Sequence, residues 1–308
     1  MRICGFTIVR NAARLGYPFE ESIRSLLPLV DELVVAVGRG EHKDDDTWER
    51  VEAIRAGDAR VTPFLTDWPA PRGGGDVLSQ QTNLALDRCR GDWAIYLQAD
   101  EVLHEDDVDL VRGSMRDHLR RSTEGLVFEY LHFWKSYGLV SDDWANFYPR
   151  AVRAVKPGIG IISAGDAAGF LRRRHGRTRG LLKARTRARV FHYGWCNPPE
   201  RQVARIHNFR RVYGASGPFH VSPDEIFGPR MAVRAFAGTH PLAMRERIAA
   251  GGDTGAPSQP ARWPAGVRAA AKILRHPHSA REWARPLFPV RLTNVYWRVV
   301  DALGERGA

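Results

Sequence analysis

Residues 91–101 read Gly91-Asp92-Trp93-Ala94-Ile95-Tyr96-Leu97-Gln98-Ala99-Asp100-Glu101, a short apolar run that ends abruptly in acidic side chains. An apolar run of this length predicts a buried strand over residues 93–97. Ligands of open α/β sheets bind beyond the carboxyl ends of the strands, so we expect Asp100 and Glu101 at the mouth of a site. Hard carboxylate oxygens there suit Mg²⁺ or Mn²⁺. A solvated acidic helix start is the plainer interpretation, because further carboxylates follow at 105–109.

Around this stretch, apolar strand-like runs alternate with amphipathic helical runs. We predict strands over 2–9, 32–37, 60–65, 93–97 and 125–133, and helices over 18–27, from 46 onward, over 77–89 and over 105–119. The alternation is typical of an α/β fold, in which helices flank a mostly parallel central sheet. Further on, the basic stretch 172–189 suits a surface loop or an edge hairpin. A short strand over 189–193 and a helix over 200–213 follow.

The composition is that of a globular protein, with 308 residues, of which 44% are hydrophobic and 26% charged. No uninterrupted apolar stretch of roughly 18 residues occurs, so no transmembrane helix is expected. The N-terminus lacks the pattern of a signal peptide. Cys4, Cys89 and Cys196 form no CxxC pair and no zinc spacing. We therefore expect reduced thiols in a cytoplasmic protein.

Charge divides the chain into two unlike halves. Residues 1–149 carry 17 Lys and Arg against 26 Asp and Glu, a net charge of −9, whereas residues 150–308 carry 29 against 9, a net charge of +20. A basic half suits a polyanionic partner such as nucleic acid, a membrane surface or an anionic acceptor. Solvated arginines are an equally good interpretation, because arginine is abundant in this half and lysine is rare.

A series of motifs, taken in order, resembles the family 2 glycosyltransferases of the GT-A fold. They are Phe6-Thr7-Ile8-Val9-Arg10-Asn11, Asp31-Glu32-Leu33-Val34-Val35-Ala36-Val37, Asp45-Asp46-Thr47, Gln81-Thr82-Asn83-Leu84-Ala85-Leu86, Gly91-Asp92-Trp93, Gln98-Ala99-Asp100-Glu101 and His192-Tyr193-Gly194-Trp195. The resemblance covers residues 1–200 or so. It implies a GT-A-like nucleotide-binding fold and an inverting, metal-dependent glycosyltransferase of the hexosyltransferase type, which takes its sugar from a nucleotide-sugar donor.

The resemblance also assigns roles at the metal and the donor. The family's metal motif is Asp-x-Asp, in which the last aspartate matches Asp100, while Gln98 replaces the first and still offers hydrogen bonds to a ribose. His192 matches the position that completes the metal shell, and an imidazole favours Mn²⁺ over Mg²⁺. Donor contacts are expected from Ile8, Val9, Arg10, Asn11, Asp45, Gln81, Asn83, Gln98, Ala99 and Asp100. The aspartate that usually follows the second strand is replaced by Gly38, so the base stays open, with UDP the commonest choice.

An inverting transfer also needs a general base for the acceptor hydroxyl, which the family takes from the middle of the chain. Asp166 is the first candidate, because it is an isolated carboxylate in a loop of small and apolar residues. Asp143 is the second, and Asp142 and Glu129 are alternatives. The acceptor itself, whether a saccharide, a lipid-linked molecule or a small molecule, stays open.

The expected organisation is a GT-A-like domain over 1–213, with a donor-binding half over 1–133 and an acceptor-side half over 134–213. A helical basic extension over 214–308 follows. The extension carries an apolar stripe, which is expected to dock on the domain itself, with peripheral contact at the inner face of a membrane as the alternative. The stripe includes Leu292, Val295, Val299 and Leu303.

Three other functions are weighed against the enzyme. An inactive GT-A-fold binding module is compatible with the substitutions Gln98 and Gly38. A polyanion-binding protein would use the basic half, but no motif that reads nucleic acid accompanies it, which argues against nucleic acid. A sugar nucleotidyltransferase would need a Gly-rich loop with basic residues directly after the first strand, and residues 6–14 contain no glycine.

Overall fold

The computed structural model describes residues 1–40, 42, 44–141, 147–215, 220–222, 226–227 and 233–251, all of which belong to one unit, Met1–Ala261. Its sheet begins with four parallel strands in the order β3 (Val61–Thr66), β2 (Glu32–Gly38), β1 (Ile3–Val9) and β4 (Trp93–Tyr96). Every residue of β1 and β4 is buried, as expected for parallel strands covered on both faces. The predicted strand positions are therefore confirmed to within a residue or so at each end.

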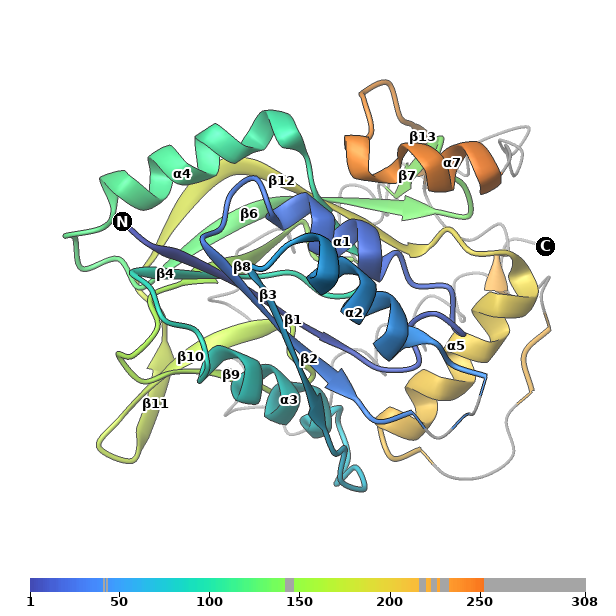
Figure 1. Ribbon diagram of the computed structural model, residues 1–308, viewed down its shortest axis with the longest axis horizontal. Coiled ribbons are helices and arrows are strands. Elements are labelled where there is room, and N and C mark those ends of the chain that lie inside the picture. The colour runs from blue at the N-terminus through green and yellow to red at the C-terminus, as the bar shows by residue number, and fades with distance from the viewer. Residues whose placement is uncertain are drawn as a thin grey trace, which may run out of the picture. The chain divides into compact units, whose positions relative to one another are not determined.

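Helices cover both faces of this parallel half (Figure 1). On one face, α1 (Phe19–Leu26), α2 (Thr47–Gly57) and α4 (Val108–Asp117) share a core with Val35 and Ile95 of the sheet. On the other face, α3 (Asp76–Leu86) shares a second core with Phe6 and Tyr96. Because neighbouring strand residues point to opposite faces, the near-continuous apolar strands build both cores at once. The predicted α/β architecture is confirmed.

Beyond β4 the sheet becomes mixed, with parallel and antiparallel pairs, which the sequence did not indicate. β8 (Arg150–Val155) pairs antiparallel with both β4 and β6 (Gly125–Trp134), and β12 (Lys183–Trp195) runs parallel to β6. The short β5 (Glu101–Leu103) pairs antiparallel with β12, with His192 opposite Glu101. This register brings the predicted downstream histidine beside the acidic turn after β4. At the outer edge, β7 (Leu139–Ser141) pairs with β13 (Val233–Ala235).

A small three-stranded sheet lies beside the second core. It consists of β9 (Ile161–Ala164), β10 (Gly169–Arg174) and β11 (Arg177–Gly180), so the first part of the basic stretch is a hairpin and its last part is the start of β12. The strand β12 is longer than the predicted range 189–193, since it begins at Lys183. In its first part exposed arginines alternate with buried residues. The chain continues into α5 (Pro199–Val212), a 3-10 turn over Leu242–Met244 and α7 (Arg245–Gly251).

The remaining predictions concern the C-terminal part of the chain. Residues 252–308, which carry most of the predicted basic extension and its apolar stripe, lie outside the described residues. Within the described part, no helix combines the length and the apolar character that crossing a membrane requires.

Candidate active site

The turn between β4 and β5 carries Asp100 and is fixed by its backbone. The Ser22 hydroxyl of α1 donates to the Gln98 carbonyl (3.1 Å), and the Tyr193 amide of β12 donates to the Asp100 carbonyl (2.8 Å). The turn also closes on itself, because the Glu101 amide donates to the Gln98 carbonyl (3.0 Å). These bonds leave the Asp100 carboxylate free to meet other groups at the carboxyl end of β4.

Two cationic or cation-binding side chains meet one oxygen of that carboxylate. Nη2 of Arg205 lies 2.8 Å from Oδ2 of Asp100, and Nε2 of His192 lies 3.6 Å from the same oxygen. Asp100 and His192 are each 13% exposed and Arg205 only 6%. Burial by itself raises the pKa of Asp100, but His192 and Arg205 outweigh it and hold that pKa well below its usual range. The carboxylate is therefore ionised at neutral pH.

Gly194 makes this close approach possible. A Cβ at position 194 would lie 2.6 Å from Cε1 of His192 and 2.8 Å from Oδ2 of Asp100. Real Cβ atoms do not approach other atoms this closely, so any side chain here would push the two groups apart. The glycine two residues after His192 thus has a steric purpose at the site.

A second histidine, His132, orients the first. Nε2 of His132 lies 2.8 Å from the Tyr148 carbonyl, which can only accept, so this nitrogen carries the proton. Burial lowers the pKa of His132 to about 3, so the ring is neutral and its Nδ1 is an acceptor. That Nδ1 lies 3.1 Å from Nδ1 of His192, which must therefore be the donor. Nε2 of His192, the nitrogen that faces Asp100, is consequently the one that binds a proton or a metal ion.

Glu101 does not lie at the mouth of the site, so that part of the prediction is wrong. Its side chain is fully buried and accepts from Nε (2.8 Å) and Nη2 (2.7 Å) of Arg153, the Tyr130 hydroxyl (2.8 Å) and the Gln98 amide (3.0 Å). Glu101 is the first residue of β5 and its side chain is turned into the core, whereas Asp100 still belongs to the turn before that strand. The buried Glu101–Arg153 ion pair stabilises the turn, because Glu101 accepts from the Gln98 backbone amide.

The candidate general bases are separated by the structure. Asp166 lies in the turn between β9 and β10, where its carboxylate accepts from the Tyr213 hydroxyl (2.9 Å) and the Ala168 amide (3.2 Å). Arg153 connects this turn to the acidic one, because its Nη1 donates to the Ala168 carbonyl (3.2 Å). Glu129 instead forms surface ion pairs with two arginines. Asp142 and Asp143 lie outside the described residues.

Four of the predicted donor residues lie at or just after the carboxyl end of β1. Ile8 and Val9 close β1 and are buried, and Asn11 follows with a positive φ of 51°. In the described part of the chain, the buried Oδ1 of Asn11 has no hydrogen-bond partner, and neither has the indole Nε1 of Trp68. Arg10 stacks 5.2 Å from the Trp68 ring. A side chain at Gly38 would collide with Trp68, which explains why this position holds no aspartate.

The other predicted donor residues have structural contacts. Asp45 accepts from the Arg14 amide (3.2 Å) and the Thr47 hydroxyl (2.8 Å), and so fixes the turn after β1. Gln81 donates to the Asp67 carbonyl (3.0 Å), but its buried Oε1 has no partner in the described residues. Both amide atoms of Asn83 bind the backbone of Ser163, at 3.0 and 2.7 Å. Asn83 therefore secures β9 through one donor and one acceptor of its amide.

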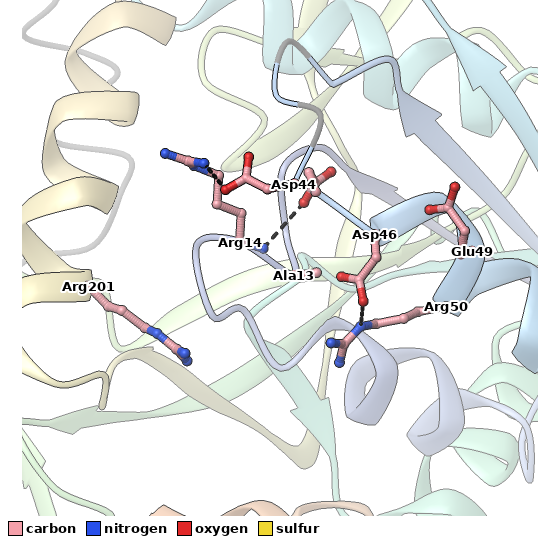
Figure 2. Close-up of a pocket in the computed structure, with 8 residues that line it drawn as sticks. Ala13, Arg14, Asp44, Asp46, Glu49, Arg50 and Arg201 are labelled. Carbon is pink, nitrogen blue, oxygen red and sulfur yellow. Dashed lines mark hydrogen bonds and ion pairs between the residues drawn. The ribbon is translucent and has the colours of Figure 1, made fainter.

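A separate surface pocket of about 550 Å³ lies over the start of α2 (Figure 2). Its lining residues are Ala13, Arg14, Asp44, Asp45, Asp46, Glu49, Arg50 and Arg201. Most of these charges neutralise each other, since Arg14 pairs with Asp44 and Arg50 with Asp46. Asp100 and His192 do not line it, so the pocket is not the place where the predicted chemistry would occur.

One further group has metal-ligand character among the described residues, and it consists of His104, Glu105 and Asp106. Nδ1 of His104 accepts from the Asp106 amide (3.1 Å), and its Nε2 meets the Thr239 hydroxyl (3.1 Å). Both ring nitrogens are thus used in capping the turn before α4 and in contacting the later chain. This group is structural.

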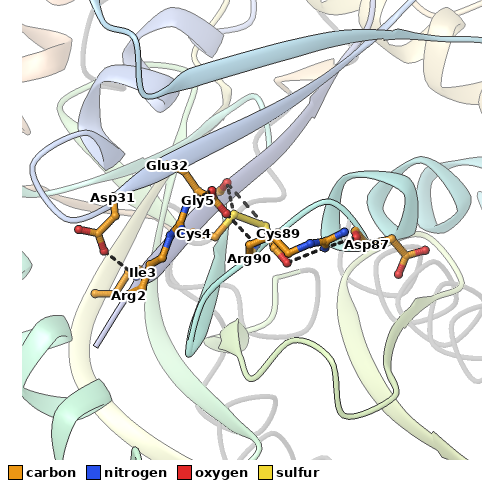
Figure 3. The surroundings of a disulfide bond; sticks show 9 residues. All are labelled: Arg2, Ile3, Cys4, Gly5, Asp31, Glu32, Asp87, Cys89 and Arg90. Atoms are coloured by element: carbon orange, nitrogen blue, oxygen red, sulfur yellow. Dashed lines mark hydrogen bonds and ion pairs between the residues drawn. A yellow bond between two sulfur atoms is a disulfide. The ribbon is translucent and has the colours of Figure 1, made fainter.

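The cysteines lie outside the candidate site, but two of them differ from the expectation of reduced thiols. Cys4 of β1 and Cys89, just after α3, form a disulfide (Figure 3). Cys196 is a buried thiol. The expectation of reduced thiols is wrong for the first pair, because 85 residues separate them in sequence and only the fold brings them together. The cysteine pattern therefore no longer supports a reducing compartment.

Comparisons with known proteins give weak matches. No protein-family model matches the sequence, and no curated protein matches it either. S. aureus TarS residues 1–349 with UDP-GlcNAc is 18% identical over 43% of this chain and 35% of that chain, at a TM-score of 0.32. A second match is glucosyl-3-phosphoglycerate synthase from Mycobacterium tuberculosis in complex with Mn²⁺, UDP and glucosyl-3-phosphoglycerate. It is 14% identical over 70% of this chain and 81% of that chain, at a TM-score of 0.38. The chain thus spans about a third of TarS, and matches this weak carry no argument about activity.

Proposed function

We propose that the protein is a glycosyltransferase that moves a sugar from a nucleotide-sugar donor to an acceptor hydroxyl, with a divalent cation at Asp100 and His192. One observation carries the proposal. At the carboxyl end of β4, an ionised carboxylate oxygen and the cation-binding nitrogen of an oriented imidazole face each other across a glycine that leaves them room. This is the end of the sheet at which α/β folds bind their ligands.

The residues present fit a divalent cation. A carboxylate oxygen and an imidazole nitrogen are both ligands of Mn²⁺, and the imidazole makes Mn²⁺ a better fit than Mg²⁺. His132 and Tyr148 supply the outer contacts that hold His192 in one tautomer, as such partners do in metal sites. When bound, the cation would neutralise charge on a departing diphosphate.

The nucleoside would lie over the ends of β1 and β2. Asn11 offers a buried acceptor and Trp68 a buried donor, neither of which has a partner among the described residues. Every nucleobase, uracil included, carries both a donor and acceptors, so this pair could bind the base without selecting it, and UDP remains the commonest choice. Gln98, in the acidic turn, would contact the ribose. The same region would be shaped by Ile8, Val9, Arg10, Asp45, Gln81 and Ala99, with Asn83 using the part of its amide that Ser163 leaves free.

We assign the general base to Asp166. The Tyr213 hydroxyl and the Ala168 amide orient its carboxylate, and Arg153 ties its turn to the one that carries Asp100. A base acts from hydrogen-bonding distance of the proton that it removes, so the acceptor hydroxyl would bind between these two turns. Attack from that side, opposite the departing nucleotide, would invert the sugar carbon.

Release of nucleoside diphosphate from a panel of nucleotide sugars, with Mn²⁺ and with small-molecule and saccharide acceptors, tests the proposal. Wild type should turn over at least one donor, and Asp100→Ala should lower that rate by about a hundredfold or more, as expected when transition-state charge is left uncompensated. Asp109→Ala is the matched control, because Asp109 is an exposed carboxylate on α4. Equal rates for Asp100→Ala and wild type would refute the assigned site.

A further inference from the structure

Arg205 is a buried part of the site rather than a surface charge. It lies on α5, only 6% exposed, with its guanidinium carbon 3.8 Å from the centre of the Tyr17 ring. The Asn197 amide is best oriented with its nitrogen donating to the Gly16 carbonyl (3.0 Å), and its oxygen then accepts from Nη1 of Arg205. Nη2 donates to Oδ2 of Asp100 (2.8 Å). The Tyr17 ring and the Asn197 amide therefore hold the guanidinium against Oδ2 of Asp100.

The same oxygen is the one that His192 faces. A divalent cation that used Oδ2 of Asp100 and Nε2 of His192 would therefore lie next to the Arg205 guanidinium. Two positive charges that share one carboxylate oxygen repel each other strongly in a site that is largely closed to water. The guanidinium and the metal ion would therefore compete for the negative charge of this oxygen.

We infer that Arg205 competes with the divalent cation for Asp100 and keeps the carboxylate neutralised until the donor arrives. The inference rests on the metal site of the proposed function. The guanidinium leaves the carboxylate when another anion becomes available to it, and the diphosphate of the donor is an anion of the right chemistry. Cation and nucleoside diphosphate then bind cooperatively, because each favours the state in which Arg205 has left Asp100.

Mn²⁺ binding to the full chain, followed by the electron paramagnetic resonance signal of the free ion, tests this without any need for turnover. Arg205→Gln should bind Mn²⁺ more tightly than wild type by about tenfold or more in the absence of nucleotide, because a unit charge next to the ion is removed. Arg201→Gln, one turn earlier on α5 and not paired with Asp100, should stay within about twofold of wild type. Asp100→Ala combined with Arg205→Gln should lose the tight binding.

The second measurement is the effect of UDP on the same titration. UDP should tighten Mn²⁺ binding to wild type but have a much smaller effect on Arg205→Gln, because the competing charge is already gone. Arg205→Lys keeps the charge without the planar group that stacks on Tyr17, and should give an intermediate affinity. This variant serves as the test if thermal unfolding shows that Arg205→Gln does not fold.

The outcomes separate this inference from the proposed function. Unchanged or weaker Mn²⁺ binding in both folded Arg205 variants would overturn the competition, even if wild type transfers sugar. Tighter binding in the variants that depends on Asp100 would support it, even if no donor sugar is turned over.

Discussion

Removal of Arg153 should be among the most destabilising single changes in the protein. Arg153 and Glu101 are both fully buried, and Arg153→Met would remove two hydrogen bonds to the Glu101 carboxylate. Glu101 would keep the Tyr130 hydroxyl and the Gln98 amide but would become an uncompensated buried charge. Breaking a buried ion pair in this way costs about 3–5 kcal/mol, a large share of the roughly 5–15 kcal/mol that stabilises a typical domain.

Urea unfolding followed by circular dichroism measures this cost. Arg150→Met is the matched control, because Arg150 lies on the same strand and its ion pair with Glu129 is exposed, with 46% and 41% of the side chains accessible. An exposed pair contributes about 0–1 kcal/mol, so the control should stay near wild type. The double variant Glu101→Leu/Arg153→Met should recover part of the loss, because it leaves no buried charge.

The result that would refute this reasoning is a loss below about 1 kcal/mol for Arg153→Met. Such a result would mean that Glu101 is protonated or hydrated in the folded protein. The acidic turn would then lack the support that the structure gives it. A double variant less stable than Arg153→Met would also contradict the account, since it would show that packing rather than charge sets the cost.

Three further predictions concern acid stability, the disulfide and the site glycine. The Arg179 side chain lowers the pKa of Glu124 below its ordinary value of 4.5; burial opposes this shift and the Leu182 amide adds to it. The stability that this carboxylate contributes is therefore present above pH 4.5 and is lost as the pH falls through its pKa in the folded protein. Acid unfolding curves should therefore be shallower for Glu124→Gln than for wild type, and equal slopes would count against the Arg179 contact. Reduction of the Cys4–Cys89 disulfide, which closes 85 residues of chain, should lower the free energy of unfolding by about 4 kcal/mol, seen as a lower Tm in dithiothreitol; an unchanged Tm would mean that the thiols are not bonded in solution. Gly194→Ala should weaken Mn²⁺ binding by about tenfold or more, because its methyl group displaces both ligands, whereas Gly169→Ala, which has nothing within 4 Å, should not. Equal Mn²⁺ affinities for these two variants would place the cation elsewhere.

The first half of the fold could be predicted from the sequence because its strands are short apolar runs between clear helical patterns. Burial on both faces gives β1 and β4 a continuous apolar signal, which is easy to recognise. The antiparallel strands gave weaker signals. In β12, exposed arginines alternate with buried residues, and the arginines alone suggested a surface loop or an edge hairpin. The partner of a strand is set by long-range contacts that a single sequence does not display.

The candidate site was predictable only where one residue type identifies the chemistry. Asp100 could be named because a carboxylate follows an apolar strand, but the opposite orientation of Glu101 depends on the register of β5 against β12. Arg153 and Arg205 are two of many arginines, and only the structure shows that they are buried against Glu101 and Asp100. The disulfide was missed for the same reason, because its two cysteines meet only in the folded chain.

The central claim is that Asp100 takes part in a metal-dependent nucleoside diphosphate site. Thermal unfolding of wild type and Asp100→Ala with a panel of nucleoside diphosphates, with and without Mn²⁺, tests it most directly. A ligand present at about 100 times its Kd adds about 2.7 kcal/mol to the stability of the folded state. We expect one diphosphate to raise the Tm of wild type only when Mn²⁺ is present, and to have no effect on Asp100→Ala. A folded wild type that responds to no nucleoside diphosphate, with or without Mn²⁺, would contradict the account.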